Sequence, residues 1–109
     1  MEAQIGKLGR YAGPATLILS SLAEGPKHGY ALTKDIEEFA GVALRPGTLY
    51  GALSRLNESG LIEAVGGEGR RRPYRLTEDG AHALEAQLAA QHKVAEIGLR
   101  RLSVGWAAP

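Results

Sequence analysis

Three short segments with the apolar spacing of amphipathic helices follow one another in the first sixty residues, and glycine or proline separates them. Gly13 and Pro14 start the first segment, because proline at the first helical position gives up a donor that would be unpaired anyway. The second begins near Gly29 and stops at Gly41, and the third is the stretch RPGTLYGALSRLNESG. This order predicts a mainly helical fold that begins with three short helices.

The third segment divides clearly into an apolar and a polar face. Leu49, Leu53 and Leu56 line one stripe, and Gly60 predicts a left-handed cap that brings Leu61 against Leu56. At about 100° per residue, the opposite face presents residues that the core does not need. They are small, polar or basic: Gly47, Thr48, Tyr50, Gly51, Ser54 and Arg55.

The second segment places Leu32, Ile36 and Phe39 on one side, which we expect to be apolar packing surface, and charged residues on the other. Free backbone N–H groups at the start of such a helix make a ready phosphate site. A capping and packing role explains His28 and Tyr30 nearly as well. The candidate contacts at this helix start are Lys27, His28 and Tyr30.

Two short alternating segments follow the third helix and predict a β-hairpin. LIEAV is the first strand and PYRLT the second, with Tyr74 and Leu76 on one face and Arg75 on the other. A run of arginines is usually a solvated loop that keeps a domain soluble, so the charge of the connecting loop alone assigns no function. This loop, GGEGRRR, carries Arg70, Arg71 and Arg72.

Positive charge is concentrated in one third of the chain. Residues 45–77 hold six arginines and three acidic residues, a net charge of +3. The remaining residues hold seven basic and nine acidic side chains, a net charge of −2. This asymmetry is expected of a surface that meets a polyanion.

A long helix closes the chain. Thr77 caps it, Glu78 and Asp79 in its first turn complement the helix dipole, and it extends to about Leu102. Its apolar stripe is longer than a domain of this size covers alone, so we expect a homodimer, with the first helix joining the contact. The predicted interface consists of Leu17, Leu84, Leu88, Ala95, Leu99 and Leu102.

Composition excludes several classes of protein. The chain lacks cysteine, which excludes disulfides, thiol nucleophiles and cysteine-ligated metals. No apolar run approaches the roughly 18 residues of a membrane span, and the start lacks a signal-peptide core, so we expect a cytoplasmic protein. The sequence has no nucleophile elbow and no phosphate-binding glycine fingerprint, and His82 and His92 lack metal spacing. We therefore expect no enzyme, no cofactor and no metal site.

Three helices followed by a hairpin are the order of a winged helix-turn-helix, whose third helix lies in the major groove with the hairpin tip, or wing, beside it. Ser54 can donate to a phosphate or a base edge, and Arg55 can read guanine. An ion pair with Glu58 or Glu63 competes for Arg55. Tyr50 either contacts DNA, which its position beside Ser54 favours, or fills the junction between helix and hairpin.

Three stretches carry a resemblance to a known family. They are, in chain order, LAEGPKHGYALTKDI, GTLYGALSRLNESGLIE and GRRRPYRLTEDG. Through these stretches the sequence resembles the PadR family of transcriptional regulators over about Leu17 to Leu84. The resemblance implies a homodimeric bacterial repressor of the short subtype, with one terminal dimerisation helix and a DNA affinity lowered by a small molecule or another signal. It also implies that aromatic residues such as Trp106 stack on flat ligands at the dimer interface, whereas a terminal tryptophan most often packs opportunistically. The chain departs from the family at Asn57, where an acidic residue is expected.

The sequence thus predicts an N-terminal arm (1–12), a winged helix-turn-helix (13–77), a C-terminal dimerisation helix (78–103) and a tail (104–109). The expected partners are a pseudo-palindromic double-stranded DNA operator, a second copy and a small hydrophobic or aromatic effector. A winged helix used for protein or RNA contacts is the alternative, although the polar, basic face of the third helix favours duplex DNA. The predicted DNA contacts are Lys27, His28, Tyr30, Arg45, Gly47, Thr48, Tyr50, Gly51, Ser54, Arg55, Arg70, Arg71, Arg72 and Tyr74.

Overall fold

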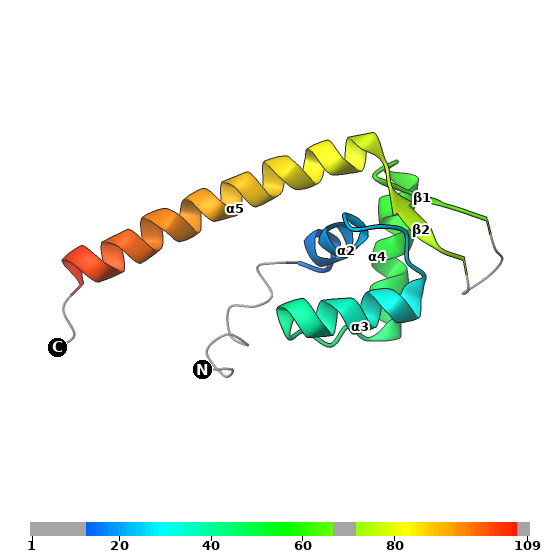
Figure 1. Cartoon of the computed structure of the whole chain (residues 1–109), viewed down its shortest axis with the longest axis horizontal. Coiled ribbons are helices and arrows are strands. Elements are labelled where there is room, and N and C mark those ends of the chain that lie inside the picture. The colour runs from blue at the N-terminus through cyan, green and yellow to red at the C-terminus, as the bar shows by residue number, and fades with distance from the viewer. Residues whose placement is uncertain (1–12, 67–71, 107–109) are drawn as a thin grey trace.

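The computed structural model describes residues 13–66 and 72–106 of the 109-residue chain. The predicted arm, the end of the tail, Arg70 and Arg71 lie outside the described residues. The prediction of a mainly helical fold with a small hairpin is confirmed (Figure 1). In chain order the elements are α2 (Pro14–Leu22), α3 (Gly29–Ala40), α4 (Pro46–Glu58), β1 (Ile62–Ala64), β2 (Tyr74–Leu76) and α5 (Glu78–Gly105).

The end of α4 has the predicted Schellman geometry. Gly60 has a φ of 77°, in the left-handed region that glycine adopts without a steric penalty. The N–H of Leu61 donates to the oxygen of Leu56 at 3.1 Å, and the N–H of Gly60 donates to the oxygen of Asn57 at 3.1 Å. These two bonds fix the direction in which the chain leaves α4.

Helices α2, α3 and α4 enclose one hydrophobic core, and the hairpin closes its side. The largest fully buried side chains come from four elements: Ile18, Leu32, Ile36, Leu53 and Ile62. Phe39 is the exception to the predicted pattern, because its side chain is 51% exposed. Its spacing puts it on the face of Leu32 and Ile36, but in this last turn of α3 it is Ala40 that packs against the core.

The hairpin is antiparallel, with Ile62 opposite Leu76, Glu63 opposite Arg75, and Ala64 opposite Tyr74. As predicted, the alternate residues Tyr74 and Leu76 of β2 are half-buried and Arg75 is exposed. The segment that precedes α3 pairs with β2 as well. The backbone of Lys27 exchanges two hydrogen bonds with that of Tyr74, at 3.1 and 2.9 Å. Strand β2 therefore pairs with β1 on one side and with the segment before α3 on the other, which ties the hairpin to the helix-turn-helix.

Helix α5 is 28 residues long and projects away from the rest of the fold (Figure 1). It continues to Gly105, three residues beyond the predicted end at Leu102, so the first two residues of the expected tail are helical. Only Gly80 and Leu84 on this helix are buried. Most of α5 therefore lies outside the core. No helix among the described residues is long and apolar enough to cross a membrane.

Candidate nucleic-acid interface

Helix α4 divides its residues between the core and solvent in the predicted way. Leu49, Leu53 and Leu56 are at most 6% exposed and anchor the helix. On the other side, its start and its polar face are open to solvent. The exposed residues there are Arg45, Gly47, Thr48, Ser54 and Arg55. The leucine stripe therefore holds α4 so that hydroxyls and a guanidinium face outward.

The guanidinium of Arg55 has no ion-pair partner among residues 13–66 and 72–106. The competing ion pairs with Glu58 and Glu63 do not form in this structure. Glu63 instead accepts a hydrogen bond from Nε of Arg75, its cross-strand neighbour, at 2.6 Å. Both side chains of that pair are about half exposed, so its contribution to stability is small. The ion pair does, however, neutralise the negative charge of Glu63 next to the wing.

Tyr50 is half-buried and packs against the hydrophobic core, in contrast to the other polar residues of its helix. Its ring lies over Gly29 in the first turn of α3. A Cβ on Gly29 would come within 2.5 Å of the hydroxyl oxygen of Tyr50 and 3.0 Å of Cζ. The expectation that the core does not need Tyr50 is therefore wrong. A DNA contact by its exposed part stays a prediction.

Replacing Gly29 with alanine is expected to destabilise the fold by about 1–3 kcal/mol, because the new methyl group overlaps the tyrosine ring. Denaturant unfolding at fixed protein concentration measures this loss. In a Tyr50→Phe background the same replacement should cost less, since the nearest atom is gone. Gly47→Ala is the matched control, because a Cβ there meets nothing within 4 Å. Equal stability of Gly29→Ala and the native chain would rule out this contact.

The side chain of Lys27, a predicted DNA contact, is held inside the fold by partners within the chain. Its Nζ donates to the backbone oxygen of Ser21 and pairs with Glu24 at 2.8 Å and with Asp35 at 3.8 Å. The Lys27 side chain is only 12% exposed. Asp35 also accepts a hydrogen bond from Oγ of Ser21 at 2.6 Å. This network joins α2 to α3, and a phosphate would have to displace it to reach the ammonium group.

His28 and Tyr30 flank the start of α3, where both are exposed. His28 occupies the N-cap position but its side chain makes no capping hydrogen bond. The ring of Tyr30 is 69% exposed and lies 5.8 Å from Nζ of Lys34. The plain capping role considered for His28 is thus absent, and both side chains remain candidates for a backbone contact with DNA.

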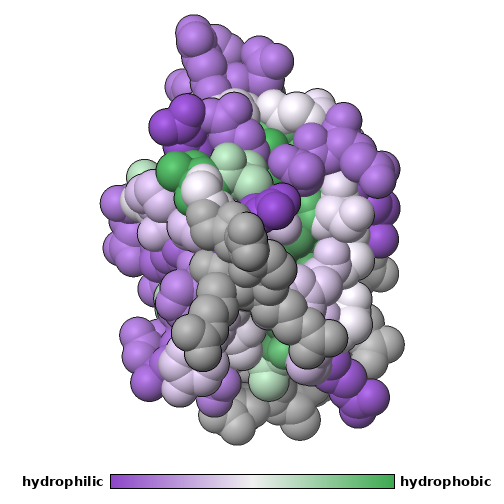
Figure 2. Space-filling model, turned by 90° about the vertical axis from the view of Figure 1, so that its right-hand side faces the viewer, coloured by the Kyte–Doolittle hydropathy of each residue, from purple (hydrophilic) through white to green (hydrophobic). Residues whose placement is uncertain are grey.

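At the wing, the structure places two of the predicted contacts. Arg72 and Tyr74 are half-buried, and Tyr74 packs against the core. Arg72 has no ion-pair partner in the described part of the chain. Figure 2 looks at the hairpin end of the molecule, where the described surface is mostly hydrophilic with small hydrophobic areas between. This end of the molecule suits a polar partner.

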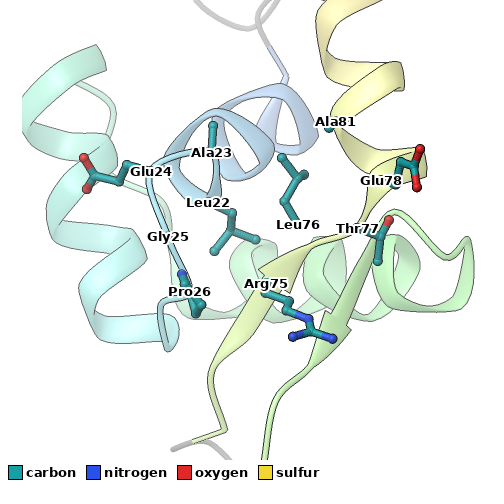
Figure 3. Close-up of a pocket in the computed structure, with 10 residues that line it drawn as sticks. All are labelled: Leu22, Ala23, Glu24, Gly25, Pro26, Arg75, Leu76, Thr77, Glu78 and Ala81. Atoms are coloured by element: carbon teal, nitrogen blue, oxygen red, sulfur yellow. The ribbon is translucent and has the colours of Figure 1, made fainter.

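Two shallow depressions lie where α2, β2 and α5 meet. The first, of about 430 Å³, reaches the loop after α2 and includes Thr77 and Arg75 (Figure 3). The second, of about 610 Å³, runs along α5 and is mostly apolar. They share Ala23, Leu76 and Ala81, so together they form one groove. Leu88 and His92 line its far end on α5.

The helix-turn-helix, the hairpin and the first turns of α5 match a described protein family. The model of the PadR-like family of transcriptional regulators matches residues 18–86 of this chain. The chain belongs to this family. The prediction made from the three sequence stretches is thereby confirmed, and the family supports a regulator that binds DNA.

Solved PadR-family structures have the same architecture. A PadR family transcriptional regulator from Eggerthella lenta is 30% identical, with a TM-score of 0.74, and the match covers 96% of this chain and 93% of the other. A PadR family regulator from Clostridium difficile is 29% identical, with a TM-score of 0.73, and the match covers 82% of this chain and 97% of the other. The PadR fold therefore extends over nearly the whole of this chain, including α5.

A curated relative is much longer than this chain. An uncharacterized 37.1 kDa transposon protein from Streptomyces fradiae is 46% identical over 71 residues. The match covers 65% of this chain but only 21% of that protein. The likeness thus concerns one PadR-like segment of the larger protein.

Proposed function

We propose that this PadR-family protein is a homodimeric repressor that binds double-stranded DNA sequence-specifically. The observation that carries the proposal is the exposed face of α4. Its hydroxyls and the guanidinium of Arg55, which pairs with no acid among the described residues, lie on the exposed side of this leucine-anchored helix. A helix held in this way can enter a major groove, where such groups read base edges. Arg72 and the start of α3 would then bind phosphates on either side.

The apolar surface of α5 supports the homodimer. Leu88, Leu99 and Leu102 are 40%, 67% and 57% exposed in a single chain, and they follow one another along one side of the helix. The apolar part of the groove continues this side toward α2. Leu17 and Leu84 are buried within one chain, so we assign the interface mainly to Leu88, Ala95, Leu99 and Leu102. A second copy would cover a surface that one chain leaves open.

We further propose that a small hydrophobic or aromatic effector lowers the affinity for DNA. Trp106 supports this part of the proposal. It lies directly after the last residue of α5, is 63% exposed, and continues the side of the helix that carries Leu88 and Leu99. Its flat ring would be available to stack on an aromatic molecule at the end of the dimer interface.

The operator is expected to be a pseudo-palindrome with half-sites about one helical turn, roughly 34 Å, or a small multiple of it apart. Two identical reading heads related by a two-fold axis require this symmetry. Selection from a pool of random duplexes, followed by footprinting on the enriched sequence, measures it. Enrichment of a motif without two-fold symmetry would count against the homodimer.

A further inference from the structure

The end of α4 and the start of α5 meet in space, although the whole hairpin separates them in sequence. Thr77, at the passage from β2 to α5 (Figure 3), makes hydrogen bonds both to the residues that follow α4 and within the first turn of α5. Its hydroxyl donates to the backbone oxygen of Gly60 at 2.7 Å and accepts from the N–H of Gly80 at 3.0 Å. Its own N–H donates to the oxygen of Leu61 at 3.1 Å. One threonine therefore joins both helix ends.

Gly80 brings the first turn of α5 into direct contact with Leu61, in the Schellman ending of α4. It is buried, and a Cβ at this position would overlap the carbonyl oxygen of Leu61 and lie 2.9 Å from the carbonyl carbon. It would also lie 2.9 Å from Cδ1 of Leu76. The obstacle is backbone, and the Leu61 oxygen is already held by Thr77, so a small side-chain movement cannot relieve the overlap. Only glycine lets the first turn of α5 approach Leu61, just after α4, this closely.

The Schellman ending of α4 supplies the other half of this connection. It fixes Gly60 and Leu61 relative to the helix axis, and Thr77 and Gly80 fix the first turn of α5 relative to Gly60 and Leu61. We name this contact of Gly60, Leu61, Thr77 and Gly80 the α4–α5 joint. Each of its links is a backbone group or a short side chain, so the joint has few torsions through which the two helices could bend relative to each other.

We propose that the α4–α5 joint sets the direction of α5 relative to α4 and thereby determines the half-site spacing that the dimer accepts. This inference rests on the proposed function, in which α5 joins two copies and α4 reads the DNA. Helix α5 has 28 residues and so extends about 42 Å, and a tilt of about 10° at the joint moves its far end by about 7 Å. Such a displacement equals about two base-pair steps of 3.4 Å. Thr77 and Gly80 are thus positioning residues for operator spacing.

The first experiment measures the direction of α5 without DNA. Because the chain has no cysteine, Glu58→Cys at the end of α4 and Ser103→Cys near the end of α5 give two unique spin-label sites, both exposed. Labelled chains diluted with unlabelled ones report the distance within one chain. Gly80→Ala and Thr77→Val should shift or broaden this distance distribution. Thr77→Ser, which keeps the hydroxyl, and Gly105→Ala, where a Cβ meets nothing within 4 Å, should leave it unchanged.

The second experiment compares duplexes with one half-site, with two half-sites at the native spacing, and with one base pair added or removed. Gly80→Ala and Thr77→Val should bind the single half-site like the native chain. Their affinity for the duplex with the native spacing should fall on the order of tenfold or more, because two heads held at the wrong distance lose avidity. Their preference among spacings should weaken or move to another spacing. Thr77→Ser and Gly105→Ala should keep the native preference.

Two results would overturn the proposed role of the joint. One is an unchanged spin-label distance in both variants, and the other is a changed distance with an unchanged spacing preference. An equal loss on the single half-site would overturn it too, since that loss indicates damage to α4 itself. A native chain that prefers no two-fold site would refute the proposed function instead. The spin-label distances would then still decide whether the joint orients α5.

Discussion

Replacing Leu88 and Leu99 together by lysine is expected to convert the dimer into folded monomers. Both side chains are substantially exposed in one chain, so the change costs little within its own core. In the dimer, two copies of Leu88 and two of Leu99 would lose the burial of the surface that a single chain exposes, 40% and 67% of each residue. At about 1.5–3 kcal/mol for a whole side chain, this loss is about 3–6 kcal/mol in total. Lysine would also bring charges to an apolar contact. Sedimentation measures the state of association, and circular dichroism shows that the helices remain.

Val94→Lys is the matched control for this variant. Val94 lies on the same helix and is 71% exposed, but it points more than about 100° away from Leu88 and Leu99 around the helix axis. It should stay dimeric and keep its operator affinity, whereas the double variant should lose the avidity of two linked heads, about 10²-fold or more. A double variant that remains dimeric would contradict the assignment of the interface to this side of α5.

The second large effect concerns the division of roles between α4 and the wing. Ser54→Ala and Arg55→Ala are each expected to lose about 1–3 kcal/mol of binding free energy on the operator and much less on random duplex. The reason is that a contact to a base edge depends on the sequence. Arg72→Ala should weaken binding to both duplexes about equally. It should also reduce the slope of log affinity against log salt by about one, the effect of losing one phosphate contact. Binding titrations on both duplexes at several salt concentrations separate these patterns.

Lys93→Ala is the control for a lost positive charge, since Lys93 is exposed on α5 and lies far along the chain from α4 and the wing. It should bind both duplexes like the native chain. If Arg55→Ala weakens operator and random duplex by the same factor, Arg55 binds phosphate only. If Arg72→Ala changes neither the affinity nor the salt slope, the described part of the wing does not touch DNA.

Most of the fold follows from local patterns in the sequence. The leucine spacing of α4, the left-handed Gly60 and the Thr77 cap each depend on residues within a few positions of one another, and each is present as predicted. The alternation of Tyr74, Arg75 and Leu76 likewise gives the correct faces of β2. Local geometry decides these features, so they can be read before any packing is known.

The sequence is less informative where side chains from different elements pack together. Lys27 reads as a free basic residue beside a helix start, but its ammonium group pairs with Glu24 and Asp35. Tyr50 lies on the polar face by its helical angle, yet the missing side chain of Gly29 leaves room for its ring. The linear sequence places a glycine beside His28 and Tyr30 but does not show which ring covers it. The buried contact of Gly80 with Leu61 is hidden for the same reason.

The apolar pattern of the sequence also does not predict where α5 ends. Leu102 is the last regular member of the apolar stripe, whereas the helix continues through Val104 and Gly105. Backbone hydrogen bonds extend a helix past the last residue that needs burial, so an apolar stripe gives a minimum length. The extension matters because it places Trp106 directly after the end of the helix.

The central claim is that α4 reads a DNA sequence, and the ratio of affinities for a selected operator and a scrambled duplex tests it most directly. At near-physiological salt the native chain should bind the operator at least about 10³-fold more tightly than the scrambled duplex, and a clear preference for the operator should persist as salt rises. Phosphate contacts weaken with salt on both duplexes, whereas base contacts belong to the operator alone. Equal affinities with the same salt slope on both duplexes would contradict the claim.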